Sequence, residues 1–104
     1  MSDLEAQFDQ AMMEIYYRAK SECNYVPSIF FNMLNQYRGV VTAKRLINAT
    51  NVSDGYTKLY DLKRLDLTVE AVVFENTKWH ELFSTEEIEK CRKRLADYRY
   101  KFKA

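Results

Sequence analysis

Apolar residues recur at steps of three and four over the first 23 positions, which is the spacing of one face of an α-helix. Ser2 and Glu5 have the spacing of a capping box, so this helix is expected to begin at the start of the chain. Residues 24–27 interrupt the pattern, because Pro27 cannot continue a helix but is accepted in the first turn of the next one. The apolar stripe consists of Leu4, Phe8, Ala11, Met12, Ile15, Tyr16, Ala19 and Cys23.

Short helices are predicted in the middle of the chain. The second covers residues 27–38 and the third residues 40–49, with Gly39 giving the backbone its freedom at the turn between them. The polar run at residues 50–55 has the composition of a turn. A fourth helix is therefore expected over residues 55–63, with Ser53 or Asp54 as its N-cap.

Two interpretations fit residues 67–74. Asp66 or Thr68 could cap a fifth, short helix, whereas the β-branched Val69, Val72 and Val73 favour a strand. The loop that follows carries Trp79, Leu82 and Phe83, which are expected to fold back onto the core.

The last helix has the clearest pattern. Ser84 and Glu87 form a second capping box at its start. An apolar stripe then continues through Ile88, Cys91, Leu95, Tyr98 and Phe102. With two glycines, one proline and no Asn-Gly or Asp-Gly turn between two segments of alternating apolar and polar residues, the chain is expected to be all-α. The predicted fold is a compact bundle of five or six helices with long first and last helices, forming one domain over residues 1–104.

The termini and the cysteines point to an intracellular protein. The acidic N-terminus lacks the basic and apolar segments of a signal peptide, and no apolar run is long enough to span a bilayer, so no membrane contact and a cytoplasmic location are expected. Cys23 and Cys91 both fall at apolar helix positions, where a thiol behaves as a small hydrophobic group. Both are expected to be buried and reduced.

Catalytic chemistry finds little support in the sequence. The metalloprotease motif would need a second histidine four residues after His80, where Ser84 stands. Nucleophile elbows, phosphate loops and calcium loops are also missing. A Cys–His pair would require Cys23 or Cys91 to meet His80 in space. No enzyme activity, catalytic residue, cofactor or metal is therefore predicted.

Charge is unevenly distributed although the formal net charge is only +1. Residues 1–22 carry five acidic and two basic side chains, while residues 89–104 carry seven basic and two acidic ones. The final segment alternates aromatic and basic residues, a combination that binds phosphates and stacks on bases. Candidate nucleic-acid contacts in the basic region of residues 89–104 are Arg92, Lys93, Arg99, Tyr100, Lys101 and Lys103. A solvated basic helix end, or contact with an acidic protein such as the N-terminal half of a second copy, would explain the same pattern.

Two further groups of residues are candidates for binding. Lys44, Arg45 and Arg64 could converge into an anion-binding patch, or Arg64 could instead form an ion pair with Asp66. Eight tyrosines are many for this length, and tyrosine suits protein interfaces because it is both apolar and polar. The candidates for a protein interface lie off the helical stripes: Tyr17, Tyr25 and Tyr100.

Three segments in the middle of the chain resemble a small bacterial all-helical domain family without an established function. They are residues 39–47 (GVVTAKRLI), 53–59 (SDGYTKL) and 64–73 (RLDLTVEAVV), which are similar to the family patterns GGVxAAKRLL, SDGFTxL and RLDLTVEAxV. The resemblance covers about residues 11–98. Arg38 departs from the pattern, which has a glycine there. The resemblance implies no catalytic residues, and it implies stand-alone proteins or appendages, sometimes of nucleic-acid-processing enzymes.

The sequence thus predicts a non-catalytic binding or adaptor module that acts through protein–protein contacts, with a nucleic-acid-handling protein as one kind of partner. Self-association stays open. The alternative is direct binding of nucleic acid through the basic aromatic C-terminal helix.

Overall fold

The computed structural model describes residues 3–102 and confirms the all-α prediction, because this part of the chain holds helices and no strand. Five α-helices are joined by turns and by two 3₁₀ helices, η1 and η2. In chain order these elements are α1 (Asp3–Cys23), α2 (Ser28–Asn48), α3 (Asp54–Asp61), η1 (Leu65–Leu67), α4 (Val69–Glu75), η2 (Thr77–Leu82) and α5 (Thr85–Asp97).

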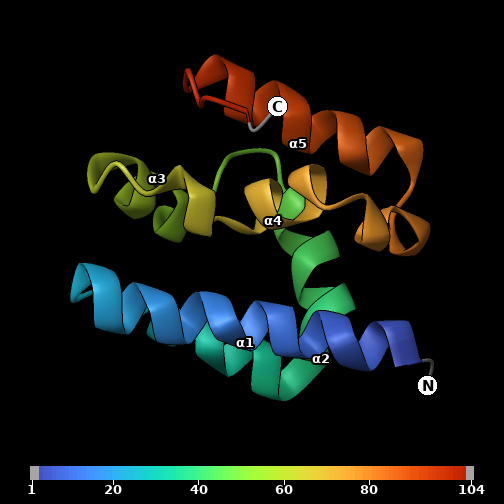
Figure 1. Cartoon of the computed structure of the whole chain (residues 1–104), viewed down its shortest axis with the longest axis horizontal. Coiled ribbons are helices and arrows are strands. Elements are labelled where there is room, and N and C mark those ends of the chain that lie inside the picture. Colours follow the sequence, from blue (N-terminus) through green and yellow to red (C-terminus); the bar gives the residue numbers. More distant parts are fainter. Residues whose placement is uncertain (1–2, 103–104) are drawn as a thin grey trace.

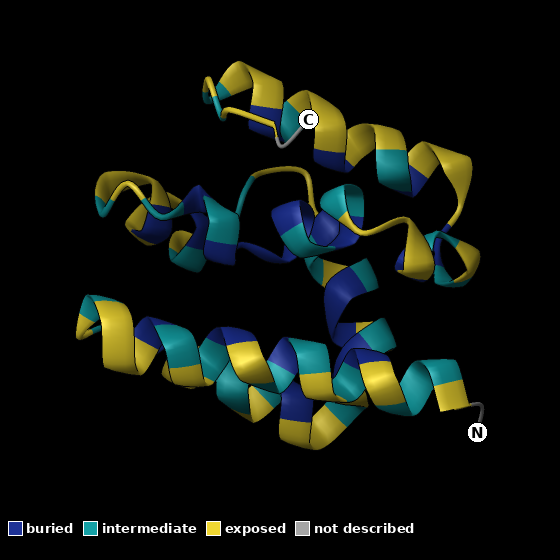
Figure 2. Ribbon diagram, in the orientation of Figure 1, coloured by how far each residue is buried: buried dark blue, intermediate teal, exposed yellow. Residues whose placement is uncertain are grey.

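The helices form three layers with α4 at the centre. In Figure 1, α1 and the first part of α2 run along the bottom, α5 lies across the top, and α3 and α4 lie between them. Most of the short helix α4 is buried, as Figure 2 shows. The main core combines side chains from α1, α2, α4, η2, α5 and the residue that follows η2: Phe8, Met12, Ile15, Leu34, Ala43, Ile47, Val69, Val73, Trp79, Phe83 and Cys91.

Helix α2 is broken at Arg38, so the two helices predicted over residues 27–38 and 40–49 are recovered as two halves of one element. The backbone of Arg38 has φ 68° and ψ −177°, a conformation that is essentially restricted to glycine. Gly39 was predicted to supply the conformational freedom at this turn, and that prediction is wrong. The positive φ belongs to the residue before it.

Gly39 is needed instead because another helix approaches it closely. A Cβ atom at this position would lie 2.8 Å from Oδ1 of Asp9 and 3.1 Å from the Phe8 ring. The backbone N–H of Gly39 donates a hydrogen bond of 2.7 Å to that same Asp9 carboxylate, which also pairs with Arg38. Asp9 of α1 therefore caps the second half of α2, where the break leaves a backbone donor free.

Replacing Arg38 by glycine is expected to stabilise the protein by about 1–2 kcal/mol. A strained backbone of this kind costs about 1–3 kcal/mol, whereas the exposed ion pair with Asp9 contributes at most about 1 kcal/mol. Urea unfolding of Arg38→Gly beside Arg38→Ala measures the difference. The alanine variant loses the ion pair but keeps the strain, so it should gain nothing, and a glycine variant no more stable than wild type would refute the account.

The predicted helix caps are confirmed where the described residues test them. Ser53 accepts a hydrogen bond from the backbone N–H of Tyr56 at 3.1 Å and begins α3. Thr68 caps α4 in the same way, so the segment that could have been a strand is helical. Ser84 and Glu87 form the predicted capping box of α5. The first predicted capping box includes Ser2, which lies outside the described residues.

The last helix is shorter than its apolar stripe indicated. It ends at Asp97, and Arg99 adopts a left-handed backbone with φ 60°. Tyr98 turns back onto Tyr56 and Tyr60, and Phe102 packs edge-on against Phe74. The prediction that Tyr98 and Phe102 continue the helical stripe is therefore wrong, although both rings still pack against other aromatic residues.

Candidate functional site

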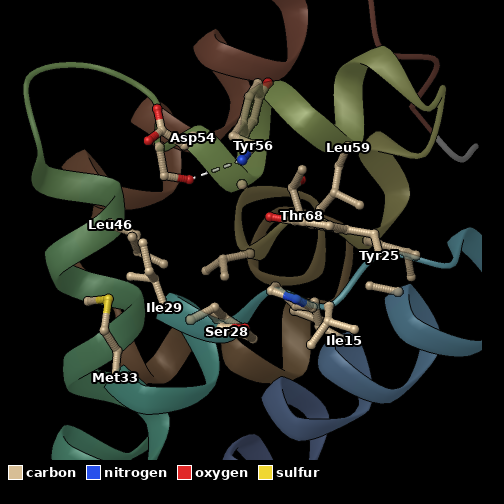
Figure 3. Close-up of a pocket in the computed structure, with 18 of the residues that line it drawn as sticks. Ile15, Tyr25, Ser28, Ile29, Met33, Leu46, Asp54, Tyr56, Leu59 and Thr68 are labelled. Atoms are coloured by element: carbon tan, nitrogen blue, oxygen red, sulfur yellow. Dashed lines mark hydrogen bonds between the residues drawn. The ribbon is translucent and has the colours of Figure 1, made fainter.

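An apolar cavity of about 350 Å³ lies beside α4. Figure 3 shows Ile15 of α1 on one side, Ile29, Met33 and Leu46 of α2 on another, and Leu59 of α3 opposite. Its size is within the usual range for ligand-binding sites, roughly 300–1,000 Å³. The remaining lining residues come from α1, the α1–α2 connection, η1 and the starts of α2, α3 and α4: Ala19, Tyr25, Val26, Pro27, Ser28, Phe30, Ser53, Asp54, Gly55, Tyr56, Leu67, Thr68, Val69 and Glu70.

Small residues and helix starts make up part of the cavity wall. Ala19 and Gly55 present little or no side chain to the cavity. A Cβ atom at Gly55 would lie 3.6 Å from the Tyr25 hydroxyl, an ordinary contact distance, so a Cβ atom fits there without displacing a neighbour. Three helices also begin at the cavity wall, after Pro27, Ser53 and Thr68.

Apolar surface continues from the cavity to the outside of the molecule. Ile29 is 74% exposed and Val26 is 48% exposed, and both line the cavity. Scattered single apolar residues at a surface need no explanation, but two that border an apolar hollow form one continuous patch. Tyr25, predicted as an exposed interface residue, is half-buried and lines the same cavity. Burial raises the pKa of its hydroxyl.

The only charged residues among those lining the cavity are acidic. Asp54 lies exposed at the start of α3, while Glu70 is buried at the start of α4. No lysine, arginine or histidine lines the cavity. An anionic ligand would therefore meet carboxylates rather than cations, and the cavity favours a neutral apolar group with a positive charge near its opening.

The buried carboxylate of Glu70 is held by Arg94 of α5. Arg94 donates one hydrogen bond of 3.0 Å to Glu70 and another of 2.9 Å to the carbonyl of Leu46, and it also donates to the carbonyl of Ala49. Burial raises the pKa of Glu70, while its backbone hydrogen bond and Arg94 oppose that rise. This guanidinium links α5 to α4 and to the end of α2. The sequence of α5 did not indicate this role of Arg94, because arginines are common on exposed helix faces.

A second carboxylate is held at the start of α5. Glu87 accepts hydrogen bonds from Lys44 at 2.8 Å, from Asn48 at 2.7 Å and from the backbone N–H of Ser84 at 2.9 Å. Burial alone would raise the pKa of Glu87, but these donors outweigh it and lower the pKa to about 2. Lys44, a predicted anion contact, is thus already paired with a carboxylate of the protein itself.

Stability should fall in acid because of Glu87. Its pKa is lower in the folded state than its ordinary value of 4.5, so its stabilising contribution is complete above pH 4.5 and is lost between pH 4.5 and about 2. Glu87→Gln is expected to cost about 1–2 kcal/mol at pH 7, a value reduced for the solvent that reaches Lys44. Urea unfolding from pH 7 to pH 2 should show the two proteins converging in acid. A difference that stays constant with pH would contradict this assignment.

Three of the other predicted cations, Arg45, Arg64 and Arg92, are each engaged by another side chain of the protein. Arg45 stacks on the Tyr37 ring at 4.1 Å, and Arg92 pairs with Glu89. Arg64 pairs with Asp66 at 3.0 Å and with Glu22 at 2.7 Å, which confirms the ion-pair interpretation of that residue. Lys44 and Arg64 are thus held by carboxylates of different elements. Lys93 is exposed on α5, and Lys103 lies outside the described residues.

The remaining predicted interface tyrosines differ in exposure. Tyr17 is 56% exposed on α1 and does not line the cavity. Tyr100 is half-buried, and its hydroxyl donates a hydrogen bond of 2.6 Å to Glu75. Only Tyr25 of the three lines the cavity.

The residues considered for catalysis have structural roles. His80 lies within hydrogen-bond distance of the carbonyls of Val73 and Phe74, at 3.1 and 3.2 Å, so its Nε2 holds the proton and closes the end of α4. Cys91 is buried as predicted, and burial raises the pKa of its thiol to about 12. Cys23 is only partly buried, contrary to expectation, and Arg64 donates to its sulfur at 3.8 Å. Residues 3–102 contain no group of three side chains able to hold a metal ion.

Comparison with known proteins adds no identification: no protein-family model, curated protein or solved structure matches this chain. None of the helices in the described range combines the length and apolar composition needed to cross a membrane.

Proposed function

We propose that this chain is a non-catalytic binding module whose protein partner inserts an apolar side chain into the cavity beside α4. The observation that carries the proposal is an apolar hollow of about 350 Å³ with exposed apolar residues at its opening. Burying one large aliphatic or aromatic side chain contributes about 1.5–3 kcal/mol, so an anchor of this kind supplies a useful part of a binding energy.

The exposed rim favours a protein over a small molecule. A compound enclosed by the cavity would leave Ile29, at 74% exposure, and Val26 largely in water. A polypeptide segment can fill the cavity with one side chain and cover the rim with its neighbours, which is how buried anchors and their surroundings are arranged in protein interfaces.

The charge of the site specifies the segment further. Asp54 and Glu70 are the charged residues of the lining, and Glu70 is already paired with Arg94. Asp54 lines the cavity and is exposed to solvent. The partner segment is therefore expected to carry a lysine or arginine close to its apolar anchor, where it would pair with Asp54 and improve specificity and association rate.

A selection from a random 12-residue peptide library, displayed on phage and panned against the immobilised full chain, tests the proposal. Enriched peptides should share a large apolar residue next to a basic one. Gly55→Leu, which adds a side chain to the cavity wall, should weaken their binding about tenfold or more, and Ile29→Ser should weaken it several-fold, as expected for lost anchor and rim contacts.

Val41→Ser is the matched control, since Val41 is an exposed aliphatic residue of the same helix that does not line the cavity. Its affinity should equal that of wild type. Enriched peptides without the apolar and basic pair, or peptides that bind the Gly55→Leu variant as well as wild type, would overturn the proposal. So would saturation of the cavity by the neutral dye Nile red with no peptide enriched at all, because that result would make it a small-molecule site.

A further inference from the structure

A second hollow, separate from the cavity, lies where the chain leaves α5 and passes the end of α3. It is an open groove of about 310 Å³. Three tyrosines and three basic residues make up most of its lining: Tyr60, Tyr98, Tyr100, Lys63, Arg99 and Lys101. Leu65 and Asp66 complete it.

The ends of two helices bring these cations together. Lys63 follows α3 with φ 62°, and Arg99 follows α5 with φ 60°. At each end the next residue's N–H closes the last turn, from Arg64 to the Leu59 carbonyl at 2.8 Å and from Tyr100 to the Leu95 carbonyl at 2.9 Å. Both helices thus end in the left-handed turn that usually contains glycine, and here both turns carry a basic side chain.

These two positions are costly places for a basic residue. A left-handed backbone costs roughly 1 kcal/mol more for a residue with a Cβ atom than for glycine. Strained backbone at a surface groove, in two residues of the same charge, is the kind of observation from which a binding role can be inferred.

The charge of the groove is positive. Asp66 is the acidic residue in its lining, and Arg64 already pairs with it at 3.0 Å. No ion pair among residues 3–102 uses Lys63, Arg99 or Lys101. The groove therefore presents three cations to a ligand.

The aromatic rings of the groove are held in fixed positions. Tyr98 meets Tyr60 edge-on, with ring centres 4.9 Å apart, and Tyr56 on its other side at 5.0 Å. Tyr100 is anchored by its hydrogen bond to Glu75. Tyr60 is 45% exposed and offers ring surface to the solvent. A rigid platform of this kind loses little entropy when a flat group stacks on it.

We infer that this groove binds single-stranded nucleic acid, with Lys63, Arg99 and Lys101 contacting phosphates and Tyr60 stacking on a base. The combination of cations with an exposed ring favours nucleic acid over an acidic peptide, which would use the cations alone. The site differs from the basic helix face predicted from sequence, because residues 98–102 are not helical and half of the groove's lining residues belong to α3, the turn after it and η1.

Fluorescence anisotropy with a labelled 12-nucleotide oligo-dT tests this inference on the full chain. Replacing both Lys63 and Arg99 by glycine removes two cations and relieves the backbone strain, so this variant should melt at the same or a higher temperature. Its affinity should fall about tenfold at low salt, and the slope of log affinity against log salt should decrease by about 1.4, corresponding to two lost phosphate contacts. Tyr60→Leu should weaken binding about tenfold with the salt slope unchanged.

A double variant with Lys20→Gln and Lys58→Gln is the control, because it loses the same charge at exposed positions outside the groove. It should bind like wild type. The inference fails if the control loses as much affinity as the glycine variant, if wild type shows no binding at low salt, or if poly-glutamate competes as well as unlabelled oligo-dT. None of these results bears on the apolar cavity, whose ligand and variants are different.

Discussion

Replacing Arg94 by methionine is expected to lower the free energy of unfolding by about 3–5 kcal/mol at pH 7, the usual cost of removing one partner of a buried ion pair. The side chains of Arg94 and Glu70 are 14% and 4% exposed. Without Arg94, the carboxylate of Glu70 stays buried without its cation, and the carbonyls of Leu46 and Ala49 lose a donor. Urea unfolding followed by circular dichroism measures the loss.

A second variant separates the charge from the packing. Adding Glu70→Leu to Arg94→Met removes both charges, and a buried pair replaced by apolar residues of similar volume is often as stable as the original. The double variant should therefore recover at least half of the loss. The pairing would be refuted as a stabilising link if Arg94→Met cost less than about 1 kcal/mol, or if the double variant were no more stable than the single one.

Replacing Phe8 by alanine is expected to cost about 3–5 kcal/mol, the range for large aromatic residues in a core. The Phe8 side chain is fully buried and meets Trp79 and Phe83 edge-on, with ring centres 5.2 and 5.4 Å apart. It also packs beneath Gly39, at the point where α1 supports the break in α2. Thermal and urea unfolding give the value.

Phe8→Leu refills most of the volume and should cost much less, about 1–1.5 kcal/mol. Phe8 does not line the cavity. The folded fraction of Phe8→Ala should therefore bind the selected peptides with wild-type affinity. A cost for alanine no larger than that for leucine would show that the ring is not central to the core.

Much of the fold can be predicted from local rules. The steps of three and four in α1 and α5 reflect the geometry of a helix, and Ser53, Thr68 and Ser84 act as N-caps because a hydroxyl oxygen can accept a free backbone N–H. Residues 69–75 form helix α4, although the valines of this segment have a high propensity for β-strands. Here the Thr68 cap and burial against α5 outweigh the preference of three valines for a strand.

What could not be predicted depends on contacts between distant segments. Arg38 takes the unusual backbone conformation because Asp9, 29 positions away in sequence, binds both Arg38 and the next N–H. The end of α5 is set by rings of α3 and α4, which hold Tyr98 and Phe102 outside the helix. A hydrophobic stripe records only that a side chain is buried, and a ring can be buried from a turn as well as from a helix.

The candidate sites were predicted only in part. Tyr25, Arg99, Tyr100 and Lys101 were singled out from the sequence and do line hollows. The cavity itself is a property of packing, and residues such as Ile29 and Gly55 look like ordinary members of a helix and a turn until the helices are assembled. Lys63 and Tyr60 were missed because they reach the C-terminal segment only through the fold.

The most direct test of the binding account is an NMR measurement of intermolecular contacts between a selected peptide and the full chain. Nuclear Overhauser effects should connect the apolar anchor of the peptide to methyl groups inside the cavity, on Ile15, Met33, Leu46 and Leu59. Those methyl groups lie on three different helices, so contacts to all of them identify the cavity without ambiguity. Contacts only to exposed residues outside it, such as Tyr17 or Val41, would contradict the account.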